Sequence, residues 1–437
     1  MERNFYLQQL ISRMNNGLIK VITGIRRCGK SYLVFSLFKQ YLLEHQVSED
    51  RIITLALDDD SCAVYRNPLQ LSQYLRDRIS SSRETYYVLI DEIQYCYRIK
   101  RDDMDENKVA PEDRDSLYIT FYDVLNGIQR LGNVDIYVTG SNSKMLSSDV
   151  QTIFRGRSDE VRIHPFSFAE YHDFLNGDKY DDWENYMVYG GMPLSVLETD
   201  ETKRRNYLKN LYAEVYLKDL MERHKIQDQV LLEAILDALN SAVGSLTNPT
   251  KLANSISSTM NIRTTANTVD LYIQYLIQAF LFEKAQRFDV KGKKYFETPY
   301  KLYSEDVGLR NARLNWRQQE RPHIMENILY NELTRRGFSV DVGVVTIDSY
   351  KNGKREVRQH EIDFIINQGF KKTYIQSAFF LGSSEKKEQE LLPLRHCRDF
   401  FRKIVVTGGN EKLWQDEEGI LHIGIIPFLL DSNILER

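Results

Sequence analysis

Residues 24–31, near the N-terminus, have the residue types and spacing of a phosphate-binding loop. They read G-x-x-x-x-G-K-S, between an apolar run at 18–23 and a second one that begins at residue 32. In a strand–loop–helix setting the two glycines let backbone N–H groups converge on phosphate oxygens. The lysine reaches the β- and γ-phosphates, and the serine hydroxyl binds Mg²⁺. The sequence therefore predicts a nucleoside triphosphate site formed by Gly24, Ile25, Arg26, Arg27, Cys28, Gly29, Lys30, Ser31 and Tyr32.

Two acidic residues, Asp91 and Glu92, follow another apolar run at 86–90. In enzymes with a phosphate-binding loop, the first acid of such a pair holds Mg²⁺, directly or through water. The second acid can act as a general base toward the attacking water. We therefore expect Ser31 and Asp91 to bind Mg²⁺ and Glu92 to be catalytic. A solvated turn is the alternative interpretation of the acidic pair.

A third apolar run, at 134–138, leads into Ser141 and Asn142. Ligands of open parallel sheets bind outside the carboxyl ends of the strands, so one of these two side chains is a candidate for positioning the attacking water. A helix N-cap is the alternative. Arg155 or Arg157 could stabilise charge on the γ-phosphate in a neighbouring subunit's site, as arginine fingers do. A solvated surface position is the alternative for these arginines.

The positions of these motifs predict an α/β domain built on a parallel sheet over residues 1–170. The length of 437 residues suggests about three domains in all.

With 58 basic and 62 acidic residues the net charge is −4, so any contact with nucleic acid must come from local patches. The four cysteines form no C-x-x-C pair, which argues against a zinc site or a disulfide framework. Without a signal-peptide core or an apolar run of about 18 residues, we expect a cytoplasmic protein and no membrane partner.

Several stretches resemble AAA+ ATPases and, more narrowly, a prokaryotic AAA+-like family with a C-terminal DUF4143-type region. They are GIRRCGKS at 24–31, DEIQ at 91–94, TGSNSKMLS at 139–147, FRGR at 154–157, HPFSFAEY at 164–171 and YGGMP at 189–193. The resemblance implies ATP as the nucleotide, with Mg²⁺, and raises the expectation of a homo-oligomer. No guanine-recognition motif of the N-K-x-D kind stands out.

The middle of the chain is expected to be helical over 171–230, as a lid or linker, and to form a winged helix over 231–320. The latter prediction comes from a helix–turn–helix pattern followed by two strands, at 281–285 and 294–297. The candidate recognition helix shows no outward arginine or lysine. Its flanks carry the cations that could contact DNA phosphates: Arg263, Lys291, Lys293 and Lys294. A purely structural winged helix is the alternative.

The last segment, 321–437, alternates in the order α-β-β-β-α-β and resembles the restriction-endonuclease-like fold. Under this resemblance Glu326 and Asp363 match acidic metal ligands, and Gln376 stands at the first position of the E-x-K strand motif. Ala378 occupies the position of the lysine. The segment is therefore expected to be a degenerate scaffold or binding domain, with an active nuclease as the alternative.

Three hypotheses about function follow. The leading one is an ATP-hydrolysing switch of the AAA+ type that couples its nucleotide state to DNA or to another partner. The second is an ATP-binding module or scaffold that binds DNA without turnover. The third is an ATP-gated, metal-dependent DNA nuclease.

Overall fold

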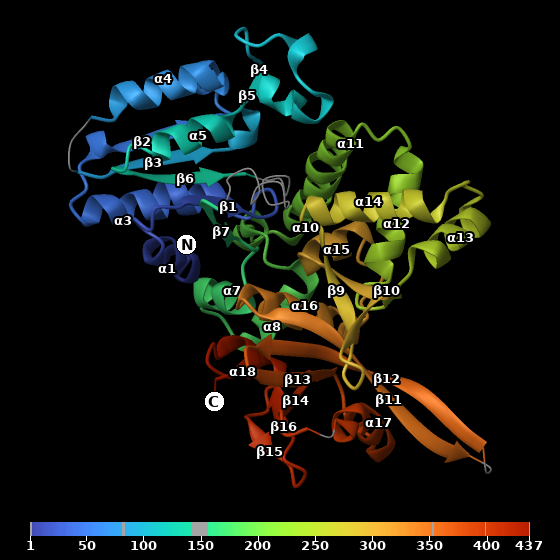
Figure 1. Ribbon diagram of the computed structural model, residues 1–437. Coiled ribbons are helices and arrows are strands. Elements are labelled where there is room, and N and C mark those ends of the chain that lie inside the picture. The colour runs from blue at the N-terminus through green and yellow to red at the C-terminus, as the bar shows by residue number, and fades with distance from the viewer. Residues whose placement is uncertain (1, 81–83, 141–155, 352–353, 398, 437) are drawn as a thin grey trace. The chain divides into compact units, whose positions relative to one another are not determined.

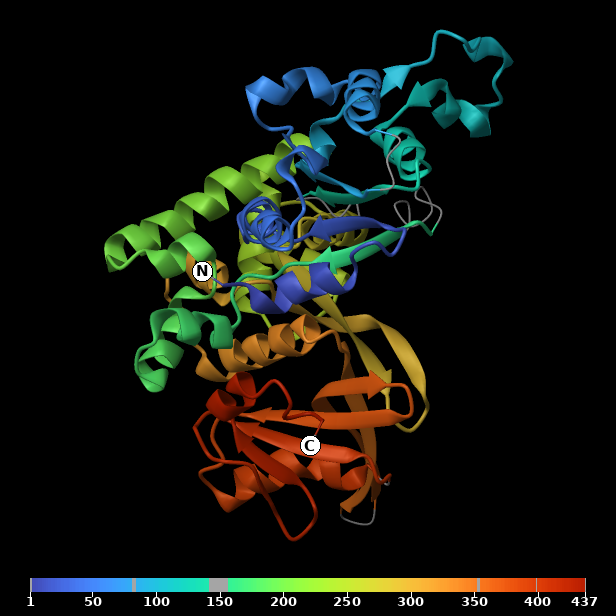
Figure 2. The same cartoon turned by 90° about the vertical axis from the view of Figure 1, so that its left-hand side faces the viewer.

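The chain falls into two compact units, Met1–His164 and Pro165–Arg437 (Figures 1 and 2). The computed structural model describes residues 2–80, 84–140, 156–351, 354–397 and 399–436. Within these ranges no helix is both long enough and apolar enough to cross a bilayer.

Five parallel strands form the central sheet of the first unit, in the order β2-β3-β6-β1-β7. They are β1 (Ile19–Thr23), β2 (Ile52–Ala56), β3 (Tyr86–Asp91), β6 (Val134–Thr139) and β7 (Ser158–Arg162). The central strands β1, β3 and β6 are almost entirely buried, as expected of a parallel sheet covered on both faces. The predicted strands and their parallel arrangement are confirmed.

Helices cover both faces of this sheet (Figure 1). The helical elements are α1 (Asn4–Ser12), α2 (Lys30–Tyr32), the π-helical segment η1 (Leu33–Phe38), α3 (Lys39–Glu44), α4 (Pro68–Arg78) and α5 (Phe121–Gln129). On one face, Leu71 of α4 and Leu125 of α5 share a core with Ile136 of β6. On the other, the Phe38 ring lies 4.5 Å from that of Tyr137, centroid to centroid. Side chains alternate along β6, so the neighbouring residues Ile136 and Tyr137 pack against helices on opposite faces of the sheet.

The segment at 98–115, which is rich in charged residues, contains short regular elements. Strand β4 (Ile99–Lys100) pairs with β5 (Tyr118–Ile119), and short 3-10 turns lie between them. Most of its side chains are exposed, so it adds little to the core.

The second unit begins with helices, as expected for 171–230. They are α7 (Phe168–Leu175), α8 (Lys179–Tyr189), α9 (Pro193–Leu197), α10 (Glu201–Asn210), the π-helical segment η8 (Leu211–Leu217) and α11 (Lys218–His224). Then follow α12 (Gln229–Ser241), β8 (Leu246–Thr247), α13 (Pro249–Met260), α14 (Ala266–Gln278), β9 (Phe282–Asp289), β10 (Lys294–Ser304) and α15 (Val307–Arg313). This order fits the outline of a winged helix, and that assignment stays a prediction.

The C-terminal elements appear in the expected order α-β-β-β-α-β. They are α16 (Arg321–Arg335), β11 (Ser339–Lys351), β12 (Lys354–Gln368), β13 (Lys371–Ala378), α17 (Ser384–His396) and β14 (Arg402–Thr407), followed by β15 (Trp414–Gln415), β16 (Leu421–Gly424) and α18 (Ile425–Leu430). Strand β11 pairs with β9, so these strands and the β9–β10 hairpin share one nine-stranded sheet. The endonuclease-like assignment and the boundary at residue 320 stay predictions.

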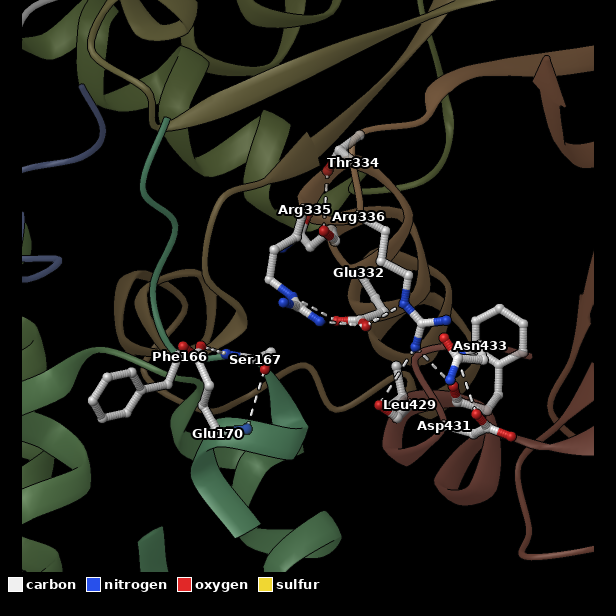
Figure 3. A network of polar contacts seen from close by, with 12 residues as sticks. Phe166, Ser167, Glu170, Glu332, Thr334, Arg335, Arg336, Leu429, Asp431 and Asn433 are labelled. Atoms are coloured by element: carbon white, nitrogen blue, oxygen red, sulfur yellow. Dashed lines mark hydrogen bonds and ion pairs between the residues drawn. The ribbon is translucent and has the colours of Figure 1, made fainter. Parts of the chain in front are cut away.

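A buried carboxylate fixes the end of α16 (Figure 3). Glu332 accepts hydrogen bonds from Arg335 and Arg336, at distances of 2.6 to 2.9 Å. Arg336 also donates to the carbonyl of Phe428 at 2.9 Å, which attaches α18 to α16. Burial opposes the charge on Glu332, but the two arginines outweigh it and hold its pKa below the ordinary value.

Candidate functional site

The loop between β1 and α2 depends on glycine at its first residue. Gly24 has a φ of 138°, and a Cβ built on it would lie 2.1 Å from the carbonyl oxygen of Ile163. Gly29, at the other end, has a φ of 101° and forms the N-cap of α2. Both positions combine a left-handed backbone with a turn or a close approach, which favours glycine. The G-x-x-x-x-G spacing therefore has a direct steric basis.

Lys30 is buried, and its ammonium lies over the first half of the loop. Its Nζ donates to the carbonyls of Gly24 and Ile25, each at 3.0 Å. The next two residues, Ser31 and Tyr32, are exposed on the first turn of the helix. The loop thus has one buried cation and, beside it, one accessible hydroxyl.

Arg3, which was not predicted from the sequence, supports the loop through a hydrogen bond to its backbone. Its guanidinium is buried and donates to the carbonyl of Cys28 at 2.9 Å and to the carbonyl of His164 at 2.7 Å. It also lies 4.6 Å from the centroid of the Tyr6 ring. These contacts join the loop to the residue at which the first unit ends. No local motif marks Arg3, because its partners lie 25 and 161 residues away.

The carboxyl end of β3 is organised by a threonine at the end of β6. Thr139 is fully buried, and its hydroxyl donates to the carboxylate of Asp91. The same oxygen accepts a hydrogen bond from the backbone N–H of Glu92 at 3.1 Å. One hydroxyl therefore orients both acidic residues. Thr139 begins the TGSNSKMLS stretch at 139–147, but its sequence neighbours do not predict this role.

Glu92 has two unusual properties. Its φ of 50° is left-handed, a conformation uncommon for a residue with a side chain. Burial raises the pKa of its carboxyl above the ordinary value, and the charge of Lys30 opposes that shift. The amide of Gln94 donates to the carboxylate. A carboxylate with a raised pKa is better suited to accept a proton than an ordinary one.

These groups meet at one edge of the sheet. Because β1, β3 and β6 are parallel, the loop at 24–31, Asp91 and Thr139 all lie at carboxyl ends of strands. Ligands of open parallel sheets bind outside this edge. Arg157 precedes β7, whose first residue pairs with the first residue of β1, so it lies at the opposite edge. Ser141, Asn142 and Arg155 lie outside the described residues.

A second cluster of charges lies in the second unit, around Lys301 of β10. Its Nζ lies 2.8 Å from Glu326 of α16, 2.5 Å from Glu361 of β12 and 3.7 Å from Asp363 of β12. The hydroxyl of Tyr303 donates to Glu326 at 2.7 Å. Glu326 and Asp363, both named as candidates from the sequence, thus lie beside the same ammonium. Lys301 was missed, although a lysine within the apolar run 300–303 is a signal for a buried cation.

The electrostatics of this cluster depend on the lysine. Burial alone would lower the pKa of Lys301, but the surrounding carboxylates raise it well above the ordinary value. Burial and the neighbouring Glu326 raise the pKa of Asp363. Gln376 donates to Glu390 at 2.9 Å, and its oxygen accepts from the N–H of Asp363 at 3.4 Å. Among the described residues, no group of three or more His, Cys, Asp or Glu has the arrangement of a metal site.

The cations predicted to contact DNA are all exposed. Arg263 lies in the turn between α13 and α14. The three lysines, Lys291, Lys293 and Lys294, lie in or next to the turn between β9 and β10.

Comparisons with known proteins identify the first unit. Residues 16–172 match the family described as an AAA domain, and residues 180–320 match a domain of unknown function, DUF8612. An uncharacterized protein of Haemophilus influenzae is 32% identical over 435 residues, with 98% of each chain covered. An uncharacterized protein of Methanocaldococcus jannaschii is 27% identical over 433 residues, which cover 94% of this chain and 87% of that protein.

Among solved structures, the Orc1 protein of Aeropyrum pernix in complex with DNA matches with 12% identity and a TM-score of 0.28. The match covers 72% of this chain and 92% of that chain. The predicted AAA+ class is confirmed at the level of an AAA domain. The DUF4143-type assignment stays a prediction.

Proposed function

Because this chain belongs to the same family as the Haemophilus influenzae protein and carries an AAA domain, we propose that it is an ATP-binding and ATP-hydrolysing switch. The observation that supports this most is the meeting of the loop at 24–31, Asp91 and Glu92 at one edge of a parallel sheet. In this proposal the nucleotide state controls binding of DNA or of another partner.

The loop would bind the triphosphate. Its backbone N–H groups, with the glycines at both ends, would surround phosphate oxygens, and the ammonium of Lys30 would turn from the loop carbonyls to the β- and γ-phosphates. Arg3 would hold the loop backbone through the Cys28 carbonyl, so that less conformational entropy is lost when ATP binds.

Ser31 and Asp91 would hold Mg²⁺. Their hydroxyl and carboxylate oxygens are the hard donors that this ion prefers, and both belong to the same sheet edge, so the residues present fit the metal. When bound, Mg²⁺ would neutralise charge that develops on the phosphates.

Glu92 would accept the proton of the attacking water. Burial raises its pKa, and the Thr139 hydrogen bond to its backbone holds it at the end of β3. Asn142 is proposed to position the same water, and Arg155 or Arg157 to act on a neighbouring copy in a homo-oligomer. The location of Arg157 at the far edge of its own sheet is consistent with a role in another subunit's site.

Turnover measured on wild type, Glu92→Gln and Lys30→Ala tests this proposal. We expect wild type to hydrolyse ATP, Glu92→Gln to bind ATP without turning it over, and Lys30→Ala to lose binding. Arg157→Ala serves as a test of subunit contribution, and mixing it with Glu92→Gln should restore part of the activity in an oligomer. Unchanged turnover in Glu92→Gln would overturn the assignment of the base.

We further propose that the C-terminal segment is a degenerate scaffold or binding domain and not a nuclease. The ammonium of Lys301 lies among Glu326, Glu361 and Asp363, where a metal-dependent nuclease would need its cation. The test is incubation of duplex, single-stranded and branched DNA with the protein and Mn²⁺. Cleavage that disappears in Asp363→Ala would overturn this proposal.

A further inference from the structure

An open cavity of about 490 Å³ lies at the carboxyl ends of three parallel strands in the second unit. Strands β13, β14 and β16 run in one direction, and their last residues, Ala378, Thr407 and Gly424, lie opposite one another (Figure 1). The segment that follows β13, at 379–382, and the end of β14, at 407–409, line the cavity. Ligands of open parallel sheets bind outside this edge, and cavities of about 300–1,000 Å³ hold small molecules.

The wall of this cavity is largely aromatic and has one acidic side chain. Phe379, Phe380 and Trp414 line it, together with the carboxylate residue Glu411. Among the described residues that line the cavity there is no lysine or arginine, and the cluster around Lys301 takes no part. Phe380 is 66% exposed and Trp414 is 47% exposed, so a ligand seated against them would bury apolar surface that the fold leaves in water.

Backbone hydrogen bonds hold the segments of the wall together. The N–H of Gly408 donates to the carbonyl of Phe379 at 3.0 Å, which joins the ends of β14 and β13. The N–H of Gly424 donates to the carbonyl of Glu411 at 2.8 Å, which joins the segment after β14 to the end of β16. The cavity is therefore formed before a ligand arrives, and less conformational entropy is lost on binding.

The indole of Trp414 is fixed by the imidazole of His422, which also lines the cavity. The two ring centroids lie 4.3 Å apart, and the ring planes are inclined by 13°. His422 is buried, and its Nε2 lies 2.9 Å from the carboxylate of Asp416. Almost half of the Trp414 surface stays exposed, so the indole is fixed in orientation and still accessible to a ligand.

The carboxylate of Glu411 lies at the cavity wall, between two residues that line it. The hydroxyl of Thr407 donates to its Oε2 at 2.7 Å. A Cβ built on Gly409 would lie 2.6 Å from each carboxylate oxygen. Among the described residues, no cationic side chain forms an ion pair with Glu411, and its Oε1 accepts no hydrogen bond. The carboxylate thus keeps acceptor capacity for N–H donors of a ligand.

Aromatic faces beside an unpaired carboxylate are complementary to an organic cation, because the face of an aromatic ring attracts positive charge. A cation already lies against one of these rings: the guanidinium carbon of Arg321 is 5.2 Å from the centroid of Phe379. Arg321 does not line the cavity and pairs with Glu184, so it leaves the charge of Glu411 unmatched. Phosphates and carboxylates are disfavoured, because no lysine or arginine lines the described wall to receive them.

From these observations we infer that the cavity binds a small organic cation, with an amidinium or guanidinium group on an apolar body. The planar cationic group donates two N–H groups to the carboxylate of Glu411. The apolar body lies against Phe380 and Trp414. This inference goes beyond the proposed function, since the cavity lies in the second unit and uses none of the residues assigned to ATP.

Ligand-detected NMR titrations of the full chain with three probes of nearly equal shape test this site. The probes are benzamidinium, which is cationic, benzamide, which is neutral, and benzoate, which is anionic. We expect benzamidinium to bind with a Kd on the order of 1 mM, as a ligand of its size can, and about fivefold more tightly than benzamide. Benzoate should not bind. Binding of benzamide or benzoate that equals that of benzamidinium would overturn the inference, as would absence of benzamidinium binding.

Two variants and a matched control assign the binding to this cavity. Glu411→Gln keeps the shape of the side chain and should weaken benzamidinium binding about fivefold, with little effect on benzamide. Trp414→Leu should weaken both probes, because both lose an aromatic contact. The control Glu417→Gln removes an exposed carboxylate of the same segment that does not line the cavity, and it should bind as wild type. Wild-type affinity for benzamidinium in Glu411→Gln, whose side chain is exposed and whose loss leaves the core intact, would overturn the inference.

Discussion

The substitution Thr139→Val tests how the acidic pair of the first unit is held. Valine has nearly the volume of threonine, so the change removes one hydroxyl from a fully buried site with little change in packing. The interactions removed are the hydrogen bond donated to Asp91 and the one accepted from the N–H of Glu92. The left-handed backbone of Glu92 is then held less firmly.

The expected cost follows from these two hydrogen bonds. A hydrogen bond to a charged group contributes about 1.5–3 kcal/mol, and removing the partner of a buried amide costs about 1–3 kcal/mol. Because the surrounding structure relaxes and recovers part of this loss, we expect the first unit to be destabilised by about 3 kcal/mol. For a unit of this size the melting temperature falls by about 2–4 °C per kcal/mol, so a decrease of about 6–12 °C is expected. If the transition state of ATP hydrolysis lost the same free energy of stabilisation, kcat would fall about 100-fold.

The assay is ATP turnover together with thermal unfolding, for wild type, Thr139→Val and Thr139→Ser. Serine keeps the hydroxyl and loses only a methyl group, so its kcat should stay within about threefold of wild type while its melting temperature falls slightly. ATP binding should persist in all three proteins, since none of these changes touches the loop at 24–31. A valine variant with wild-type kcat, or a serine variant as impaired as valine, would refute the reasoning.

Three further predictions concern other charged groups. Arg3→Met should weaken ATP binding about tenfold, because the Cys28 carbonyl loses its donor; a folded variant with unchanged affinity in a binding titration would contradict the supporting role of Arg3. Lys301→Met should destabilise the second unit by about 3 kcal/mol at pH 8, since it leaves buried carboxylates without their cation. The pKa of Asp363 is raised, so its contribution to stability is greatest below its ordinary pKa and is lost as the pH rises. The difference in free energy of unfolding between wild type and Lys301→Met, measured by urea unfolding, should therefore become smaller toward pH 4.5. The exposed control Lys294→Met should stay near wild type. Because burial raises the pKa of Glu92 above its ordinary value of 4.5, kcat should begin to decline above pH 4.5 as the pH decreases, and a profile that stays flat to that pH would argue against Glu92 as the base.

The local elements of the first unit could be predicted because each is encoded by neighbouring residues. Apolar runs at 18–23, 86–90 and 134–138 correspond to β1, β3 and β6. Parallel strands with helical crossovers place their carboxyl ends on one edge, so the proximity of the loop and Asp91 followed from the order of the motifs. The roles of these residues stay proposals.

Other residues could not be predicted, because their partners are distant in sequence. In the second unit, the E-x-K strand motif places alanine at position 378, and this led to the expectation that no lysine accompanies the acids. Lys301 of β10 instead reaches Asp363 from a strand 62 residues earlier in the chain. The predicted strand at 294–297 was too short to include it, whereas β10 extends to Ser304.

The sequence alone determined the glycine-bounded loop at 24–31, the acidic pair after β3 and the parallel sheet, because strand periodicity and glycine spacing are local properties of the chain. Only the tertiary structure decided that Arg3 supports the loop, that the Thr139 hydroxyl connects Asp91 with Glu92, and that Lys301 lies beside Glu326 and Asp363. These features depend on which strands become neighbours and in which direction they run. That choice is made by burial of the whole core, which no single segment encodes.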